Sequence, residues 1–144
     1  MPQSVRDLGP FTVVGISAKE SNDHPEGIGK LWQDFYAKGG AKQIPNRASD
    51  DVYAVYTEYE GDHTKPYTML IGCQVSSVGT LPTGLVAKAI PGAKYAVFDA
   101  SGPQPASVVA TWVRVYQTPL QRAYVADFDR YRGPTEVEVN VGVR

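Results

Sequence analysis

Apolar and polar positions follow two periods along this chain, which predicts short strands separated by two helices. Residues 11–18 (FTVVGISA) are apolar and β-branched between turn-forming segments, which is typical of a strand. From Ile28 the spacing changes to i, i+3, i+4, i+7 and i+8, so one helical stripe carries Ile28, Leu31, Trp32, Phe35 and Tyr36. Asp23 and Glu26 have capping-box spacing, which places the start of this helix near residue 24, and Gly39-Gly40 ends it.

The same alternation of periods continues to the end of the chain. Residues 51–59 and 67–75 are rich in Tyr, Val, Thr and Ile around a polar break at 60–62, which predicts a hairpin. Residues 85–90 and 94–99 predict two strands around the Pro91-Gly92 turn signal. A second helix follows residues 101–103 and stops at Pro119; its apolar face carries Val108, Val109, Trp112, Val115 and Tyr116. Residues 122–131 and 136–143 are the last two predicted strands.

The two halves of the chain repeat the order strand, helix, strand, strand. Trp32 and Trp112 hold the same place in the two helices, and an aromatic residue follows each of them four positions later. The hairpins match at an offset of 72 (133 − 61 = 72), which aligns Tyr56 with Phe128. We predict one α+β domain over residues 1–144, with βαββ modules at 11–75 and 93–143 and a connecting strand at 85–90. Since a module of about 60 residues is marginal alone, the two should pack as a pseudo-symmetric pair with a cleft at their junction.

Charge and cysteine content exclude several classes of protein. The formal net charge of −1 gives no bulk attraction for nucleic acid or for an anionic membrane surface. Cys73 is the single cysteine, so it permits no intramolecular disulfide and no zinc ribbon, and we interpret it as a buried small hydrophobe. The first ten residues lack the pattern of a secretory leader, and no stretch reaches the ~20 apolar residues of a membrane span. We therefore expect a soluble protein of a reducing compartment, the cytoplasm.

Residues 127–131 (DFDRY) form the most unusual polar cluster in the sequence. Asp127 and Asp129 alternate along a strand, so they face the same way, together with Val125 and Tyr131. If this face looks into the junction, one acid becomes a counter-charge for a bound cation or a general base. If it looks outward, the acids form a solvated edge that pairs with neighbouring arginines. The residues alone leave both alternatives open.

Aromatic residues supply candidate walls for a pocket, because three or four rings lining a slot suit a flat or cationic ligand. The candidates are Trp32, Tyr36, Tyr56, Tyr67, Tyr95, Phe98, Trp112 and Tyr116. His24 and His63 lie in polar, turn-rich segments and have no second histidine at a ligand spacing, so both are predicted at the surface. No phosphate-loop, nucleophile-elbow or dinucleotide motif is present, and we predict no metal site and no cofactor.

Four stretches together resemble the GyrI-like, or AraC-type effector-binding, domain superfamily. They are residues 53–75 (YAVYTEYEGDHTKPYTMLIGCQV), residues 94–102 (KYAVFDASG), Thr111-Trp112 with Val115-Tyr116, and residues 127–131 (DFDRY). The resemblance runs over nearly the whole chain in order. It implies two βαββ modules side by side in a curved antiparallel sheet, with the two helices bracketing a central groove for drug-like ligands.

The resemblance also implies which residues bind the ligand. In many relatives an acidic residue in the strand that corresponds to 127–131 contacts lipophilic cations. Its position is Asp129 here, where relatives usually carry Glu; the shorter side chain leaves Asp127 as the alternative acid, or a neutral ligand. The aromatic partners by position are Trp112, Tyr116, Tyr95, Phe98, Tyr56 and Tyr67, to which the first helix adds Trp32 and Tyr36.

The chain resembles the stand-alone branch of that superfamily, which has no helix-turn-helix module and includes integron-cassette drug-binding proteins and proteins that shield DNA gyrase. We therefore expect a module that binds a hydrophobic, aromatic or cationic small molecule in the groove, without direct nucleic acid binding. Two alternatives are a hydrolase that uses an Asp-Tyr pair on a reactive small molecule, and a protein that interacts with gyrase. A homodimer of the chain is kept as a further alternative among the expected partners.

Overall fold

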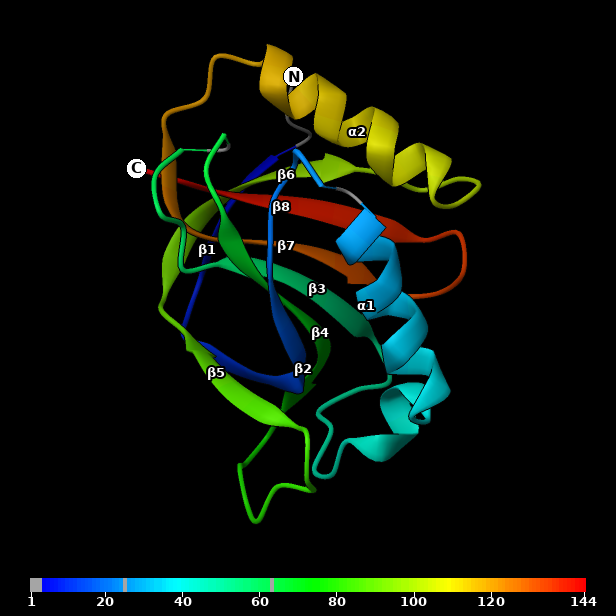
Figure 1. Ribbon diagram of the computed structural model, residues 1–144. Coiled ribbons are helices and arrows are strands. Elements are labelled where there is room, and N and C mark those ends of the chain that lie inside the picture. The colour runs from blue at the N-terminus through cyan, green and yellow to red at the C-terminus, as the bar shows by residue number, and fades with distance from the viewer. Residues whose placement is uncertain (1–3, 25, 63) are drawn as a thin grey trace.

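The computed structural model describes residues 4–24, 26–62 and 64–144, and their strands and helices alternate as the sequence predicts (Figure 1). The strands are β1 (Ser4–Leu8), β2 (Phe11–Glu20), β3 (Val52–Thr57), β4 (Tyr67–Val75), β5 (Val86–Ile90), β6 (Ala93–Asp99), β7 (Arg122–Tyr131) and β8 (Val137–Val143). The helices are α1 (Glu26–Ala37), the short 3₁₀-helix η1 (Gly40–Gln43) and α2 (Ala106–Gln117). The α+β fold class is confirmed.

The structure departs from the sequence predictions at several element boundaries and in one strand that was not predicted. Helix α1 begins at Glu26, two positions after the predicted start. Strand β1 is not predicted at all, because its five residues combine adjacent charges at Arg6 and Asp7 with a half-exposed Val5 and show no strand-like alternation. It exists because it pairs along the edge of β6.

One antiparallel sheet holds all eight described strands, and the two modules meet at its centre. The strand order is β1-β6-β8-β7-β3-β4-β2-β5. From the central β3–β7 pair outward, the order is β3, β4 and β2 on one side and β7, β8 and β6 on the other. In both modules these are the strand after the helix, the last strand and the strand before the helix. The sheet therefore has the two-fold pseudo-symmetry that the sequence repeat predicts.

The outermost strand on each side belongs to the opposite half of the chain. β1 precedes β2 but pairs with β6, whereas β5 precedes β6 but pairs with β2. The two pairings have corresponding registers, since Leu8 lies opposite Ala93 and Ile90 lies opposite Phe11. Adding 82 to the number of Leu8 gives Ile90, and adding 82 to the number of Phe11 gives Ala93 (90 − 8 = 93 − 11 = 82). The predicted connecting strand is thus the counterpart of β1, and each half is a ββαββ unit that exchanges its first strand.

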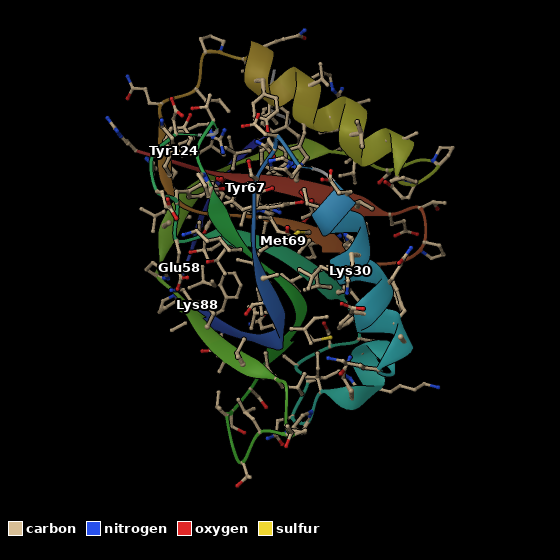
Figure 2. The ribbon with its side chains drawn as sticks, viewed as in Figure 1. Lys30, Glu58, Tyr67, Met69, Lys88 and Tyr124 are labelled. Atoms are coloured by element: carbon tan, nitrogen blue, oxygen red, sulfur yellow. The ribbon has the colours of Figure 1, made fainter. Side chains whose placement is uncertain are left out.

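Both helices cover one face of the sheet, α1 over β2 and β4 and α2 over β8 (Figure 1). Tyr67 and Met69, two positions apart on β4, point to this helical face (Figure 2). The opposite face packs its own side chains together, including Tyr53 and Phe128 at a ring-centroid distance of 5.6 Å. The predicted alignment of Tyr56 with Phe128 is therefore wrong. In the β3–β7 ladder Tyr56 pairs with Asp127, so it shares that residue's face and not the face of Phe128.

Strands β2 and β4 place two glycines opposite each other, and neither position has room for a side chain. Gly15 lies opposite Gly72, and a methyl group on Gly72 would lie 1.9 Å from the carbonyl oxygen of Val14. Gly72→Ala should therefore lower the free energy of unfolding by about 1–3 kcal/mol, because the ladder must shift to admit the side chain. Gly9→Ala is the matched control, since nothing lies within 4 Å of the added group. Urea unfolding measures the stability of both variants, and equal stability would show that the β2–β4 ladder has room for a side chain at Gly72.

Candidate functional site

A cavity of about 1130 Å³ opens between α1 and α2 above the central strands. From α1 its wall is formed by Ile28, Trp32 and Tyr36. From α2 it is formed by Val108, Val109, Trp112, Val113 and Tyr116. The sheet contributes Val52, Tyr56, Tyr67, Arg122 and Tyr131 as the floor. The groove therefore lies at the junction of the modules, where the sequence repeat predicts it.

Six of the eight aromatic candidates line this cavity: Trp32, Tyr36, Tyr56, Tyr67, Trp112 and Tyr116. Trp32 stacks on Tyr36, with 6.0 Å between the ring centroids and 19° between the planes. Tyr56 meets Trp112 edge to face at 5.5 Å. Tyr36 and Tyr116 are 62% and 46% exposed, so they stand at the mouth, whereas Tyr67 is buried. Rings of different orientation thus surround the space from both helices and the floor.

Tyr95 and Phe98 do not line the cavity, which corrects the prediction for both residues. Tyr95 lies on the face of the sheet that carries no helix, where its ring meets Phe128 at 5.1 Å. Phe98 is three positions further along β6, so it points to the other face, where it is buried among the residues under α2. Both rings are core residues.

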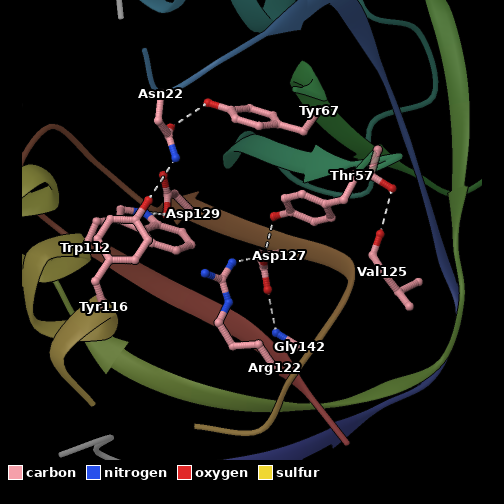
Figure 3. A network of polar contacts seen from close by, with 11 residues as sticks. Asn22, Thr57, Tyr67, Trp112, Tyr116, Arg122, Val125, Asp127, Asp129 and Gly142 are labelled. Atoms are coloured by element: carbon pink, nitrogen blue, oxygen red, sulfur yellow. Dashed lines mark hydrogen bonds and ion pairs between the residues drawn. The ribbon is translucent and has the colours of Figure 1, made fainter. Parts of the chain in front are cut away.

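Asp129 lies directly beneath the floor, held by two residues that line the cavity, of which Figure 3 shows Trp112. The Tyr56 hydroxyl donates to its Oδ2 at 2.6 Å, and the Trp112 indole N–H donates to its Oδ1 at 2.9 Å. The carboxyl group has no solvent exposure. Burial raises the pKa of Asp129 to about 7, although the two hydrogen bonds favour the ionised form and oppose the rise. This acid therefore titrates near neutral pH.

Asp127 is equally buried but has a charged partner. Its Oδ2 accepts from Arg122 Nη2 at 2.8 Å and from the Tyr59 hydroxyl, and its Oδ1 accepts from the Gly142 N–H at 2.7 Å (Figure 3). Burial raises the pKa of Asp127, and Arg122 opposes the rise. The two acids thus have different roles: Asp127 forms a neutral pair with Arg122, while Asp129 has only neutral donors.

The alternative of a solvated acidic edge is wrong, because both carboxylates have no exposed surface. The nearby arginines have other partners: Arg130 pairs with Asp51 at 2.7 Å and Arg132 with Glu138 at 3.3 Å. The expected partnership of the acids with Val125 also fails, since Val125 is half exposed. A register shift between Arg122 and Asp127 breaks the alternation there.

Among the cavity residues that were not sequence candidates, four contribute aromatic or polar side chains to the site: Tyr131, Tyr59, Arg122 and Asn22. Tyr131 lines the cavity two positions after Asp129, so the alternation of β7 already indicated it. Tyr59 and Arg122 line it because Glu58 and Tyr124 have positive φ values of 51° and 54°, which turn the chain out of regular alternation. No sequence pattern signals either turn. Asn22 lines it from the segment between β2 and α1.

Asn22 joins the floor of the groove to α2. Its Oδ1 accepts from the Tyr67 hydroxyl and its Nδ2 donates to the Tyr116 hydroxyl, both at 3.2 Å (Figure 3). Tyr67 belongs to module one and Tyr116 to module two. The amide therefore bridges the two modules at one end of the cavity.

The Asp-Tyr pair that the hydrolase alternative requires is present as Asp129 and Tyr56, but its geometry does not suit water activation. Both carboxylate oxygens already accept a hydrogen bond, and the group is sealed from solvent. A general base must reach the proton that it removes. The arrangement is better suited to holding a charge than to turning over a substrate.

No group of three or more His, Cys, Asp or Glu side chains that could hold a metal occurs in residues 4–24, 26–62 and 64–144. His24 is exposed, as predicted, with its Nδ1 3.5 Å from Glu26, whereas the prediction for His63 lies outside the described residues. Cys73 is buried and free, also as predicted. Within the same ranges, neither helix is long and apolar enough to cross a bilayer.

Comparisons with known proteins agree with this geometry. The model of the family described as Cass2, integron-associated effector binding protein, matches residues 5–141. An integron cassette protein from the mobile metagenome of Vibrio cholerae is 28% identical, with a TM-score of 0.84 over 98% of this chain and 95% of that chain. SAV2435, in a structure bound to tetraphenylphosphonium, is 20% identical, with a TM-score of 0.78 over 100% of this chain and 94% of that one. No protein of curated function matches the chain.

Proposed function

The chain belongs to the family of Cass2 integron-associated effector-binding proteins, and we propose that it binds a lipophilic organic cation in the groove between α1 and α2. The observation that carries this proposal is the Asp129 carboxylate, fully buried beneath two aromatic side chains of the cavity wall. A buried carboxylate without a positive partner is costly. Arg122, which lies nearby, already pairs with Asp127. A cationic ligand would supply the missing counter-charge.

The walls of the groove suit the rest of such a molecule. Apolar helix side chains and eight aromatic side chains give a lipophilic ligand a surface to bury, and the negative ring faces attract a cation at close range. The volume is ample for a drug-sized molecule. Tetraphenylphosphonium, the ligand in the SAV2435 structure, belongs to this chemical class and is the probe that we choose.

Binding of tetraphenylphosphonium should strengthen as the pH rises from 5 to 8. The cation favours the ionised form of Asp129, whose pKa of about 7 in the free protein means that binding at lower pH must first release a proton. The affinity should rise by about tenfold or more across this range and level off above pH 7. Isothermal titration calorimetry in buffers of matched ionic strength measures it. A complementary thermal-shift assay should show stabilisation of about 2.7 kcal/mol at 100 times the dissociation constant.

The control for this titration is a matched pair of charge-neutralising variants. Asp129→Asn should bind tetraphenylphosphonium at least tenfold more weakly than wild type at pH 8 and show no rise with pH. Asp7→Asn removes the same charge from an exposed position on β1 and should behave as wild type. Equal affinity of the two variants for tetraphenylphosphonium, or a wild-type affinity that does not change with pH, would overturn the role of Asp129.

A further inference from the structure

Arg122 holds two buried hydrogen-bond donors that its ion pair does not use. Its side chain is only 8% exposed, and its Nη2 is committed to Asp127 at 2.8 Å. Its Nε and Nη1 are buried and have no hydrogen-bond partner among the described residues. Buried donors are satisfied in most proteins, and leaving one unpaired costs free energy, so two on one guanidinium need an explanation.

Two aromatic rings lie against the guanidinium group, and one of them, that of Trp112, belongs to the cavity wall. The guanidinium carbon lies 4.4 Å from the ring centroid of Tyr124 and 5.6 Å from that of Trp112. Arg122 and Trp112 both line the cavity, and Figure 3 shows the free end of the guanidinium turned toward Trp112 and away from Asp127. A ring face attracts the positive charge, but it does not accept in-plane N–H bonds as a carbonyl oxygen does.

Trp112 therefore shields two polar groups with one side chain. Its indole N–H occupies Oδ1 of Asp129, and its ring lies over Arg122. A shift of this one ring would open both a carboxylate oxygen and the unused guanidinium donors to the groove. The ring stands on α2, whereas Arg122 and Asp129 belong to β7, so a ligand can take the place of the ring without disturbing the sheet.

We propose that Arg122 forms an acceptor subsite in the groove, where its Nε and Nη1 donate hydrogen bonds to an uncharged oxygen of the ligand once the Trp112 ring moves aside. This inference rests on the proposed function, and it narrows the ligand to an organic cation that also carries a carbonyl, sulfonyl or ether oxygen. Because both polar groups touch Trp112, the oxygen and the positive centre lie within about the span of one indole ring of each other.

The charge balance of the buried groups selects an uncharged oxygen over a carboxylate. Arg122 and Asp127 already form a neutral pair. A carboxylate on the ligand would add an unpaired negative charge to a buried region that holds Asp129 as well. A carbonyl oxygen satisfies the same donors without that cost.

The test compares three benzyltriphenylphosphonium compounds that differ only in the para substituent: acetyl and isopropenyl, which leave the molecule a cation, and carboxylate, which makes it a zwitterion. Isopropenyl has the shape of acetyl but replaces the acceptor oxygen by a methylene group. Wild type should bind the acetyl cation about tenfold more tightly than the isopropenyl cation, which is the scale of a hydrogen bond to a charged donor. The carboxylate should bind more weakly than acetyl. Calorimetry at pH 8 measures all three, with tetraphenylphosphonium as the reference.

Two variants assign the preference to Arg122. Arg122→Lys keeps the ion pair with Asp127 but removes the fork of donors. The double variant Arg122→Met, Asp127→Asn removes the pair together, so no unpaired charge is left if the lysine variant folds poorly. Circular dichroism first establishes which variants fold. In a folded variant the preference for acetyl over isopropenyl should fall to about onefold, whatever the change in the affinity for tetraphenylphosphonium, because the ratio of the two affinities reports the acceptor oxygen alone.

Each outcome decides a different statement. Equal binding of acetyl and isopropenyl by wild type, with tetraphenylphosphonium still bound, overturns the acceptor subsite and leaves the proposed function standing. A preference that survives in both variants also overturns the assignment to Arg122. If the carboxylate compound binds as tightly as the acetyl compound, the statement that Arg122 selects an uncharged oxygen is wrong. Failure of every cation to bind refutes the proposed function itself. In Trp32→Phe, Trp112 is the only tryptophan, and its emission should change on binding of the acetyl cation.

Discussion

Asp127→Ala should lower the free energy of unfolding by about 3–5 kcal/mol, the largest loss that we expect from any single substitution in the site. The variant leaves the Arg122 guanidinium charged and 8% exposed, with its ion-pair partner gone. It also removes the acceptor of the Tyr59 hydroxyl and of the Gly142 N–H. Urea unfolding followed by far-UV circular dichroism measures the change, since the sheet reports the global transition.

Two comparisons separate the buried charge from a general effect of truncation. Asp127→Asn combined with Arg122→Met should recover most of the lost stability, because no unpaired charge is left in the interior. Asp34→Ala breaks the exposed pair with Lys30 (labelled in Figure 2) and should cost only about 0.3–0.5 kcal/mol. If Asp127→Ala lost no more than Asp34→Ala, the ion pair with Arg122 would not hold the site together.

Asp129→Asn should remove a large pH dependence of stability between about pH 4 and 7. The pKa of Asp129 is raised from 3.8 to about 7, so over this window the folded protein binds more protons than the unfolded chain. The stability of the wild type therefore falls as the pH rises through the window, and is lowest above pH 7. At about 1.4 kcal/mol per unit, the loss is on the order of 4 kcal/mol. The asparagine variant should match wild type near pH 4 and exceed it at pH 8.

A second variant shifts this profile in a known direction. The Tyr56 hydroxyl favours ionised Asp129, so Tyr56→Phe should raise the pKa of Asp129 and move the loss of stability to higher pH. The quantity to measure is the difference between wild type and each variant in urea unfolding at pH 4, 5.5, 7 and 8. Other buried acids cancel in that difference. Parallel curves for wild type and Asp129→Asn would contradict the raised pKa.

Local patterns were sufficient to predict the helices and the two faces of most strands. Trp32 and Trp112 reach the cavity because the helical period puts them on the apolar stripe of their own helix, a property of neighbouring residues alone. Asp127 and Asp129 share a face because strand alternation requires it. That the cavity residues bind a ligand remains a prediction.

Tertiary arrangement accounts for what the sequence could not predict. Tyr95 and Phe98 are three positions apart on one strand, so alternation already implied that only one could face the groove, but not which. The burial of Phe98 under α2 depends on where that helix lies. Tyr59 and Arg122 enter the site through positive-φ residues that are not glycine, and composition does not signal such turns.

The crossed first strands mean that neither half of this protein is complete by itself. A chain cut within residues 76–85 would give one piece whose β1 has lost its pairing edge and whose β2 lacks an outer neighbour, and a second piece with the reciprocal defects. Each piece carries the strand that the other needs. The two pieces should reassociate when mixed, as the parts of a split enzyme do. A half-length polypeptide alone should fold as a domain-swapped homodimer, in which each copy supplies the outer strand of the other.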